Sequence, residues 1–174
     1  DGEPLSYVTQ RAWLGLRALA GSAVLVPVTT RTLEQYRRVH LGAACAYAIA
    51  ANGGHLVVDG EPDAQWAARV RARLDSSGWP LEQVREMAVR LAGRGSWVRT
   101  VRDADGLFVY LVATSRDAIP DLAELAGELA ASGWTLSVQG RKVYFVPAAL
   151  TKEAALAEVQ TRAGTSRLAA AGDS

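Results

Sequence analysis

The sequence predicts an α/β fold in which two separated segments share a mainly parallel sheet and an α+β unit is inserted between them. Short apolar runs of strand length at residues 23–28 and 47–51 are typical of strands buried on both faces, as in parallel sheets. Between residues 60 and 140, helical segments alternate with pairs of strands joined by tight turns. That alternation is typical of an α+β unit.

The first segment has the order helix, strand, helix, strand, strand. Thr32, with Gln35 in the capping-box position, begins the second helix. Pro27 argues against a central place for the first strand, because proline cannot donate to a strand ladder. Asn52-Gly53-Gly54 is a hairpin turn signal. The expected elements are a helix from Thr9 to Gly21, a strand at 23–28, a helix at 32–39 and strands at 47–51 and 55–58.

The inserted unit begins after the turn-rich stretch Asp59–Asp63. Its expected elements are helices at about 63–75, 80–92 and 120–131 and strands at about 97–102, 107–114, 135–139 and 142–146. We therefore expect a discontinuous core of residues 1–59 and 141–174, truncated at both ends, and an α+β cap of residues 60–140.

The last segment returns to the core. Thr151 begins a helix that Gly164 ends, and an apolar strand at 167–171 leads into Gly172-Asp173-Ser174. Short connections allow the two core segments to share one parallel sheet through right-handed crossovers. A natural C-terminus usually lies in a frayed, polar segment, so we expect this chain to be a fragment.

Composition excludes several classes of protein. The chain has 174 residues, with 19 basic and 18 acidic side chains and a net charge of +1, so bulk charge does not indicate a nucleic-acid binder. No apolar run approaches the roughly 20 residues of a membrane span, so we expect no membrane partner and a cytoplasmic location. The single cysteine, Cys45, excludes an intrachain disulfide and a multi-cysteine metal site.

Two candidate positions lie after the expected strands at 23–28 and 47–51. The hydroxyl of Thr29, or of Thr30 one residue later, stands before a helix start, where a phosphate oxygen can bind. The alternative is a plain threonine helix cap. Asn52 belongs to the hairpin turn signal, which needs no further function.

Two further candidates lie near the C-terminus. Lys152, one of only two lysines, opens a helix, where the macrodipole disfavours a cation unless an anion lies nearby. Its compact charge suits one phosphate oxygen, although a solvated helix lysine is the alternative. Asp173 follows an apolar strand, where a carboxylate suits Mg²⁺, and a simple turn is the alternative.

In this order the four positions resemble the motif series of the haloacid-dehalogenase-like (HAD) phosphohydrolase superfamily. The branch with a large inserted cap is most similar; it includes the Cof-type and the sucrose- and mannosylglycerate-phosphate phosphatases. The segments that carry the resemblance are Val26-Pro27-Val28-Thr29-Thr30-Arg31 for the second motif, Asn52-Gly53-Gly54 before the cap, Leu150-Thr151-Lys152-Glu153 for the third motif and Ala171-Gly172-Asp173-Ser174 for the start of the fourth.

The resemblance implies a Rossmann-like core and phosphatase chemistry dependent on Mg²⁺. In this family an aspartate attacks phosphorus, and water then hydrolyses the aspartyl-phosphate. Thr29 would hold a phosphate oxygen, Lys152 would neutralise charge, and Asp173 would bind Mg²⁺. The first motif, which carries the nucleophile, has no counterpart here, although Asp1-Gly2 could be its tail. We therefore expect the nucleophile outside this chain, and the chain by itself to be inactive.

The cap would close over the site and contact the leaving group. Arg141 and Lys142 are the expected contacts, together with Thr30 and Asn52 as further phosphate or substrate ligands. The substrate class is a small phosphorylated metabolite such as a sugar phosphate. The alternative is a non-catalytic HAD-fold or other α/β module that acts in binding or assembly.

Overall fold

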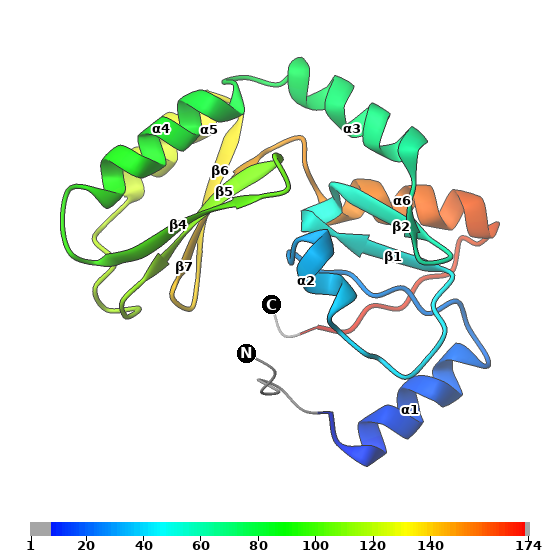
Figure 1. Ribbon diagram of the computed structural model, residues 1–174. Helices are drawn as coiled ribbons and strands as arrows, with labels where there is room; N and C mark the ends of the chain where they lie inside the picture. The colour runs from blue at the N-terminus through cyan, green and yellow to red at the C-terminus, as the bar shows by residue number, and fades with distance from the viewer. Residues whose placement is uncertain (1–7, 173–174) are drawn as a thin grey trace.

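The computed structural model describes residues 8–172 and contains two separate β-sheets (Figure 1). One sheet has the order β1-β2-β3 and the other β4-β5-β7-β6, and all neighbouring strands are antiparallel. The strands are β1 (Tyr47–Ala50), β2 (His55–Val58), β3 (Glu61–Pro62), β4 (Val98–Ala104), β5 (Phe108–Ala113), β6 (Trp134–Gln139) and β7 (Lys142–Pro147).

Helices cover one face of each sheet. The helices are α1 (Gln10–Ala20), α2 (Leu33–Arg37), α3 (Ala64–Asp75), α4 (Leu81–Ala92), α5 (Ala123–Ala131) and α6 (Lys152–Ala163), with a short 3-10 turn, η1 (Ala51–Gly53). Figure 1 shows α4 and α5 side by side over the four-stranded sheet, α6 beside β1 and β2, and α3 running from one sheet toward the other. The fully buried side chains Ile49, Leu56, Trp66, Phe108 and Phe145 form part of one continuous core.

The helices and hairpins of the sequence prediction are confirmed, with ends shifted by a few residues. Their start signals work as expected. Thr32 and Gln35 form the capping box of α2, and the Thr151 side chain accepts the Ala154 N–H at the start of α6. Gly164 ends α6 with a φ of 63°.

The expected mainly parallel sheet is not what the described residues form. The chain before Thr29 runs parallel to β1 but meets it at a single bridge, between Val28 and Ile49. Thr29 N–H donates to Ile49 O at 2.9 Å, and Ile49 N–H donates to Pro27 O at 2.8 Å. Pro27 has no N–H to extend this ladder, and β1 pairs antiparallel with β2 immediately after its turn.

The expected strand at 167–171 is also wrong. Residues 165–172 form no strand and are exposed, and Leu168 remains 56% accessible. A strand needs a neighbour for its main-chain groups, and within residues 8–172 no strand pairs with this segment.

The hairpin around Gly140-Arg141, at the expected second boundary of the inserted unit, lies within the four-stranded sheet. β7 pairs with β5 and β6 inside the four-stranded sheet, so the hairpin at Gly140-Arg141 is not divided at residue 141. The chain returns toward the three-stranded sheet only after Pro147. At the first boundary, β3 still pairs with β2 at Glu61–Pro62. The division into core and cap domains itself remains a prediction.

Candidate functional site

The turn between β1 and β2 is the point where separate parts of the chain meet. Ala51, Asn52 and Gly53 have φ values of 48°, 57° and 98°, in the left-handed region. A Cβ atom at Gly53 would overlap the main-chain oxygen of Thr151, so only glycine fits there. The turn therefore lies directly against the start of α6.

Thr29 is fixed to this turn through the main chain. Asn52 N–H donates to Thr29 O at 3.1 Å, and Ala51 N–H donates to Arg31 O at 2.7 Å. The Thr29 hydroxyl oxygen accepts the Arg31 N–H at 3.1 Å. The segment Thr29-Thr30-Arg31 is thus held at three points, with Thr29 and Thr30 half-buried.

Lys152 is connected to the same turn from the other side. The Asn52 side-chain Nδ2–H donates to Leu150 O at 2.7 Å, which fixes the two residues before Lys152. Lys152 is the first residue of α6 and is half-buried. Across residues 8–172 no carboxylate forms an ion pair with it. The helix macrodipole disfavours a cation at this position unless an anion lies nearby.

These contacts join the Thr29 segment and the start of α6 through one residue, Asn52. Whether the Thr29 hydroxyl and the Lys152 ammonium face a common point remains a prediction. Asp173, the expected metal ligand, lies outside the described residues.

Arg141 and Lys142 do not lie where the chain crosses between the sheets. Arg141 lies in the turn between β6 and β7 and Lys142 is the first residue of β7, whereas the chain leaves the four-stranded sheet only after Pro147. The expected boundary at residue 141 falls within the β6–β7 hairpin and would divide it. Lys142 Nζ lies 5.4 Å from the centre of the Tyr110 ring, on the strand face that the Gln35 side chain also reaches. Lys142 is therefore on the face turned toward α2, and Arg141 is exposed.

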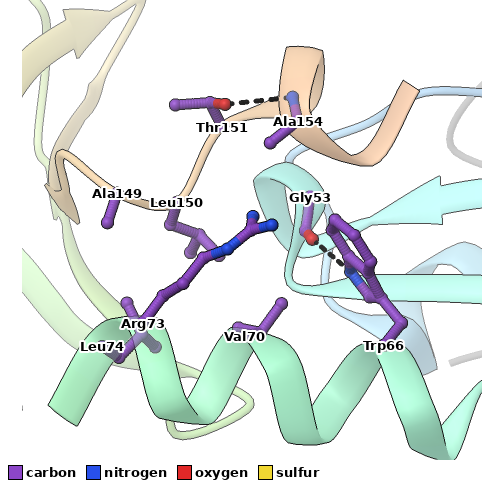
Figure 2. A pocket seen from close by; sticks show the side chains of 9 residues that line it. All are labelled: Gly53, Trp66, Val70, Arg73, Leu74, Ala149, Leu150, Thr151 and Ala154. Atoms are coloured by element: carbon purple, nitrogen blue, oxygen red, sulfur yellow. Dashed lines mark hydrogen bonds between the residues drawn. The ribbon is translucent and has the colours of Figure 1, made fainter. Parts of the chain in front are cut away.

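Sequence reasoning missed Trp66 of α3. Its Nε1–H donates to Gly53 O at 2.9 Å, and its side chain is 1% exposed. Figure 2 shows Trp66 beside Gly53 while Thr151 and Ala154 approach from α6. The crevice between them has no volume for a water molecule, so it is a packing contact and not a ligand site. A tryptophan near a helix start carries no sequence signal that identifies such a partner.

Hydrogen-bonded ion pairs between arginine and carboxylate side chains also connect α3 to α6. Arg162 donates to Asp63 Oδ2 at 2.6 Å and to Glu158 Oε1 at 2.8 Å, and Arg69 donates twice to Glu158 at 2.6 and 2.9 Å. The hydrogen bonds from Arg69 and Arg162 lower the pKa of Glu158 to about 2. Arg162 likewise lowers the pKa of Asp63. Arg69 is therefore part of a charged network between α3 and α6.

Residues 8–172 contain no group of three His, Cys, Asp or Glu side chains that could hold a metal ion. None of the helices within this range is long and apolar enough to cross a membrane.

No protein-family model and no curated protein matches the chain. Solved structures do. The sucrose-phosphatase from Synechocystis sp. PCC6803, determined with sucrose and phosphate, matches with a TM-score of 0.66 and 15% identity over 91% of this chain. A trehalose-6-phosphate phosphatase related protein matches at 0.58 and 16% over 90%. SMU.1108c from Streptococcus mutans UA159 matches at 0.51 and 9% over 90%.

The chain spans 66% of the length of each of the first two structures and 68% of the third. At such low identity the likeness concerns the fold alone. Within that limit, these comparisons support a HAD-like fold for the chain.

Proposed function

We propose that the whole protein hydrolyses the phosphomonoester of a small metabolite such as a sugar phosphate. The observation that carries the proposal is the Asn52 turn, which ties the Thr29 segment to the start of α6. The similar folds of a sucrose-phosphatase and a trehalose-6-phosphate phosphatase related protein support it.

Thr29 is the proposed ligand of a phosphate oxygen. Its Oγ1 already accepts the Arg31 N–H, so the hydroxyl proton remains available to donate. Thr30 is the neighbouring candidate for the same role. A donor fixed in advance is suited to the charge that develops on a transferring phosphoryl group.

Lys152 is the proposed counter-charge. The N–H groups at the start of α6 already favour an anion at this end of the helix, and the ammonium adds a full positive charge. The lysine charge lowers the stability of the fold when no anion is present, and a bound phosphate would offset this cost. Asn52, expected as a substrate ligand, is better assigned to positioning, because one N–H of its amide donates to Leu150 O and holds the turn against the start of α6.

The attacking aspartate and the metal rest on the family resemblance. An aspartate outside these residues would attack phosphorus, and water would hydrolyse the aspartyl-phosphate. Mg²⁺ would neutralise charge on the phosphoryl group, with Asp173 as its candidate ligand in this chain.

Lys142 and Arg141 remain proposed contacts for the leaving group. Of the two, Lys142 is the stronger candidate for this contact, because it lies beside Tyr110 on the face turned toward α2. We expect its removal to raise KM and to leave kcat less affected, because it would bind the part of the substrate that does not react.

Binding of inorganic phosphate tests the site. Titration of the ¹⁵N-labelled chain should shift the main-chain signals of Thr29–Arg31 and of Thr151–Ala154 together, and Lys152→Ala should weaken both responses. Arg90→Ala, on the distant helix α4, is the matched control. Shifts confined to surface arginines, or unaffected by Lys152→Ala, would contradict the assignment.

A further inference from the structure

Asp105, in the turn between β4 and β5, reaches across to the other sheet. Its Oδ2 accepts the Leu33 N–H at 2.8 Å and lies 3.0 Å from His55 Nε2. The Asp105 and His55 side chains are only 24% and 19% exposed. One carboxylate oxygen therefore joins the hairpin turn to both α2 and β2.

The Leu33 N–H needs an acceptor from outside its own helix. Leu33 is the first residue of α2, and main-chain N–H groups in the first turn have no acceptor within the helix. The Thr32 side-chain oxygen accepts the N–H of Gln35 and not that of Leu33. The Asp105 carboxylate accepts the Leu33 N–H, and its negative charge is favourable at the positive end of the helix.

The shape of the hairpin turn directs Asp105 to this place. Asp105 has a φ of 57°, which aspartate tolerates better than most residues, and the Asp103 side chain accepts the Gly106 N–H at 2.6 Å. The neighbouring Leu107 packs on Gly54 so closely that a Cβ there would overlap its Cδ1 atom. The turn is thus seated against the three-stranded sheet by shape as well as by charge.

The two segments that the turn contacts lie next to the candidate site. Leu33 comes two residues after Thr29-Thr30-Arg31, and Gly54-His55 follow Asn52-Gly53 directly. A further contact, from Gln35 Nε2 to Tyr110 Oη at 3.5 Å, joins α2 to the face of the four-stranded sheet. The hairpin turn therefore contacts the residues on either side of the candidate site.

We propose that Asp105 is a positioning residue that docks the β4–β5 turn onto α2 and β2 and so sets the placement of Thr29. The docking itself is independent of the enzyme's activity, and its catalytic consequence rests on the proposed phosphatase function. The same turn lines a cavity of about 500 Å³ in which Arg71 and Asp75 of α3 are the other charged side chains. Neither forms an ion pair with Asp105, and among residues 8–172 the side chain that contacts its carboxylate is His55.

Amide hydrogen exchange at Leu33 tests the docking directly. Asp105→Ala should speed exchange of the Leu33 amide by at least about tenfold, because this N–H has no other acceptor within residues 8–172. The Gln35 amide, held by Thr32, should change far less and shows that α2 remains folded. Asp105→Asn keeps an oxygen acceptor and should give an intermediate rate. Asp117→Asn, which alters a distant exposed carboxylate, should change nothing.

Kinetics of the whole protein, for which phosphatase activity is proposed, test the consequence. Asp105→Ala should lower kcat by about tenfold, since misplacement of a phosphate ligand affects the reacting group, and Asp105→Asn should recover most of it. Unchanged Leu33 exchange in Asp105→Ala overturns the docking. Faster exchange with unchanged kcat overturns the positioning role. If the wild-type protein hydrolyses no phosphomonoester, the proposed function fails, while the exchange result still decides the docking.

Discussion

The side-chain amide of Asn52 donates a 2.7 Å hydrogen bond to the main-chain oxygen of Leu150, a residue 98 positions later in the chain. The main-chain N–H of the same residue donates to Thr29 O. One asparagine therefore connects the two segments to which the proposed phosphate-binding groups belong. This connection is the basis of the first prediction.

Replacement of Asn52 should reduce stability by a predictable amount. Asn52→Ala removes the donor to Leu150 O and places alanine at a φ of 57°, so we expect a loss of about 2 kcal/mol in the free energy of unfolding. Asn52→Gly removes the same donor without the backbone strain and should lose about 1 kcal/mol. Urea unfolding measures both. A glycine variant as stable as wild type would show that the hydrogen bond contributes nothing.

Local features of the fold could be predicted from the sequence, but the contact between the Asn52 turn and the start of α6 could not. Caps at Thr32 and Thr151 and the turn at Asn52–Gly54 depend on neighbouring residues, and those expectations were confirmed. The bond from Asn52 to Leu150 joins residues far apart in the chain, and no periodicity reports it. Asn-Gly looks the same whether a hairpin turn is isolated or packed against a helix.

The expected mainly parallel sheet is the largest difference between the sequence prediction and the structure of residues 8–172. Apolar runs such as 23–28 show that a strand is buried but do not show which neighbour it pairs with. Likewise the apolar run at 167–171 resembles a strand, yet within the described residues no partner lies beside it. Pairing partners depend on topology, which the runs by themselves do not encode.

Trp66 should be sensitive to loss of its indole N–H. Trp66→Phe keeps a buried ring but leaves Gly53 O without its donor, so we expect a loss of about 1–3 kcal/mol. Trp97→Phe is the matched control, because no hydrogen bond to the Trp97 indole occurs within residues 8–172, and this change should cost less. Thermal and urea unfolding compare the two. Equal losses would mean that the ring volume, and not the hydrogen bond to Gly53, accounts for the effect.

The charges between α3 and α6 should make the protein sensitive to acid. The pKa of Glu158 is lowered from 4.5 to about 2 in the folded chain, so its contribution is present above about pH 4.5 and is lost as the pH falls toward 2. Glu158→Gln should flatten the dependence of unfolding free energy on pH in this range. Glu86→Gln, in an exposed pair with Arg90, should leave the dependence unchanged. An identical pH profile for wild type and Glu158→Gln would refute this.

Lys152 should matter more for turnover than for folding. In the longer protein, Lys152→Ala should lower kcat by about 10²-fold, the usual cost of removing one group that stabilises transition-state charge. Its unfolding free energy should rise by no more than about 0.5 kcal/mol, because removal of a cation from a helix start relieves an unfavourable interaction with the macrodipole. Lys152→Arg should recover part of the activity. Equal losses of activation and unfolding free energy would make Lys152 structural.

The most direct test of the proposed function is release of inorganic phosphate from sugar phosphates in the presence of Mg²⁺. The chain extended upstream of Asp1 and the 174-residue chain are assayed side by side, each with and without a chelator. We predict that the extended protein turns over a sugar phosphate, loses that activity on chelation, and that the 174-residue chain shows none. Equal, chelator-sensitive turnover by both would place the nucleophile within these residues, and no turnover by the extended protein would contradict the phosphatase assignment itself.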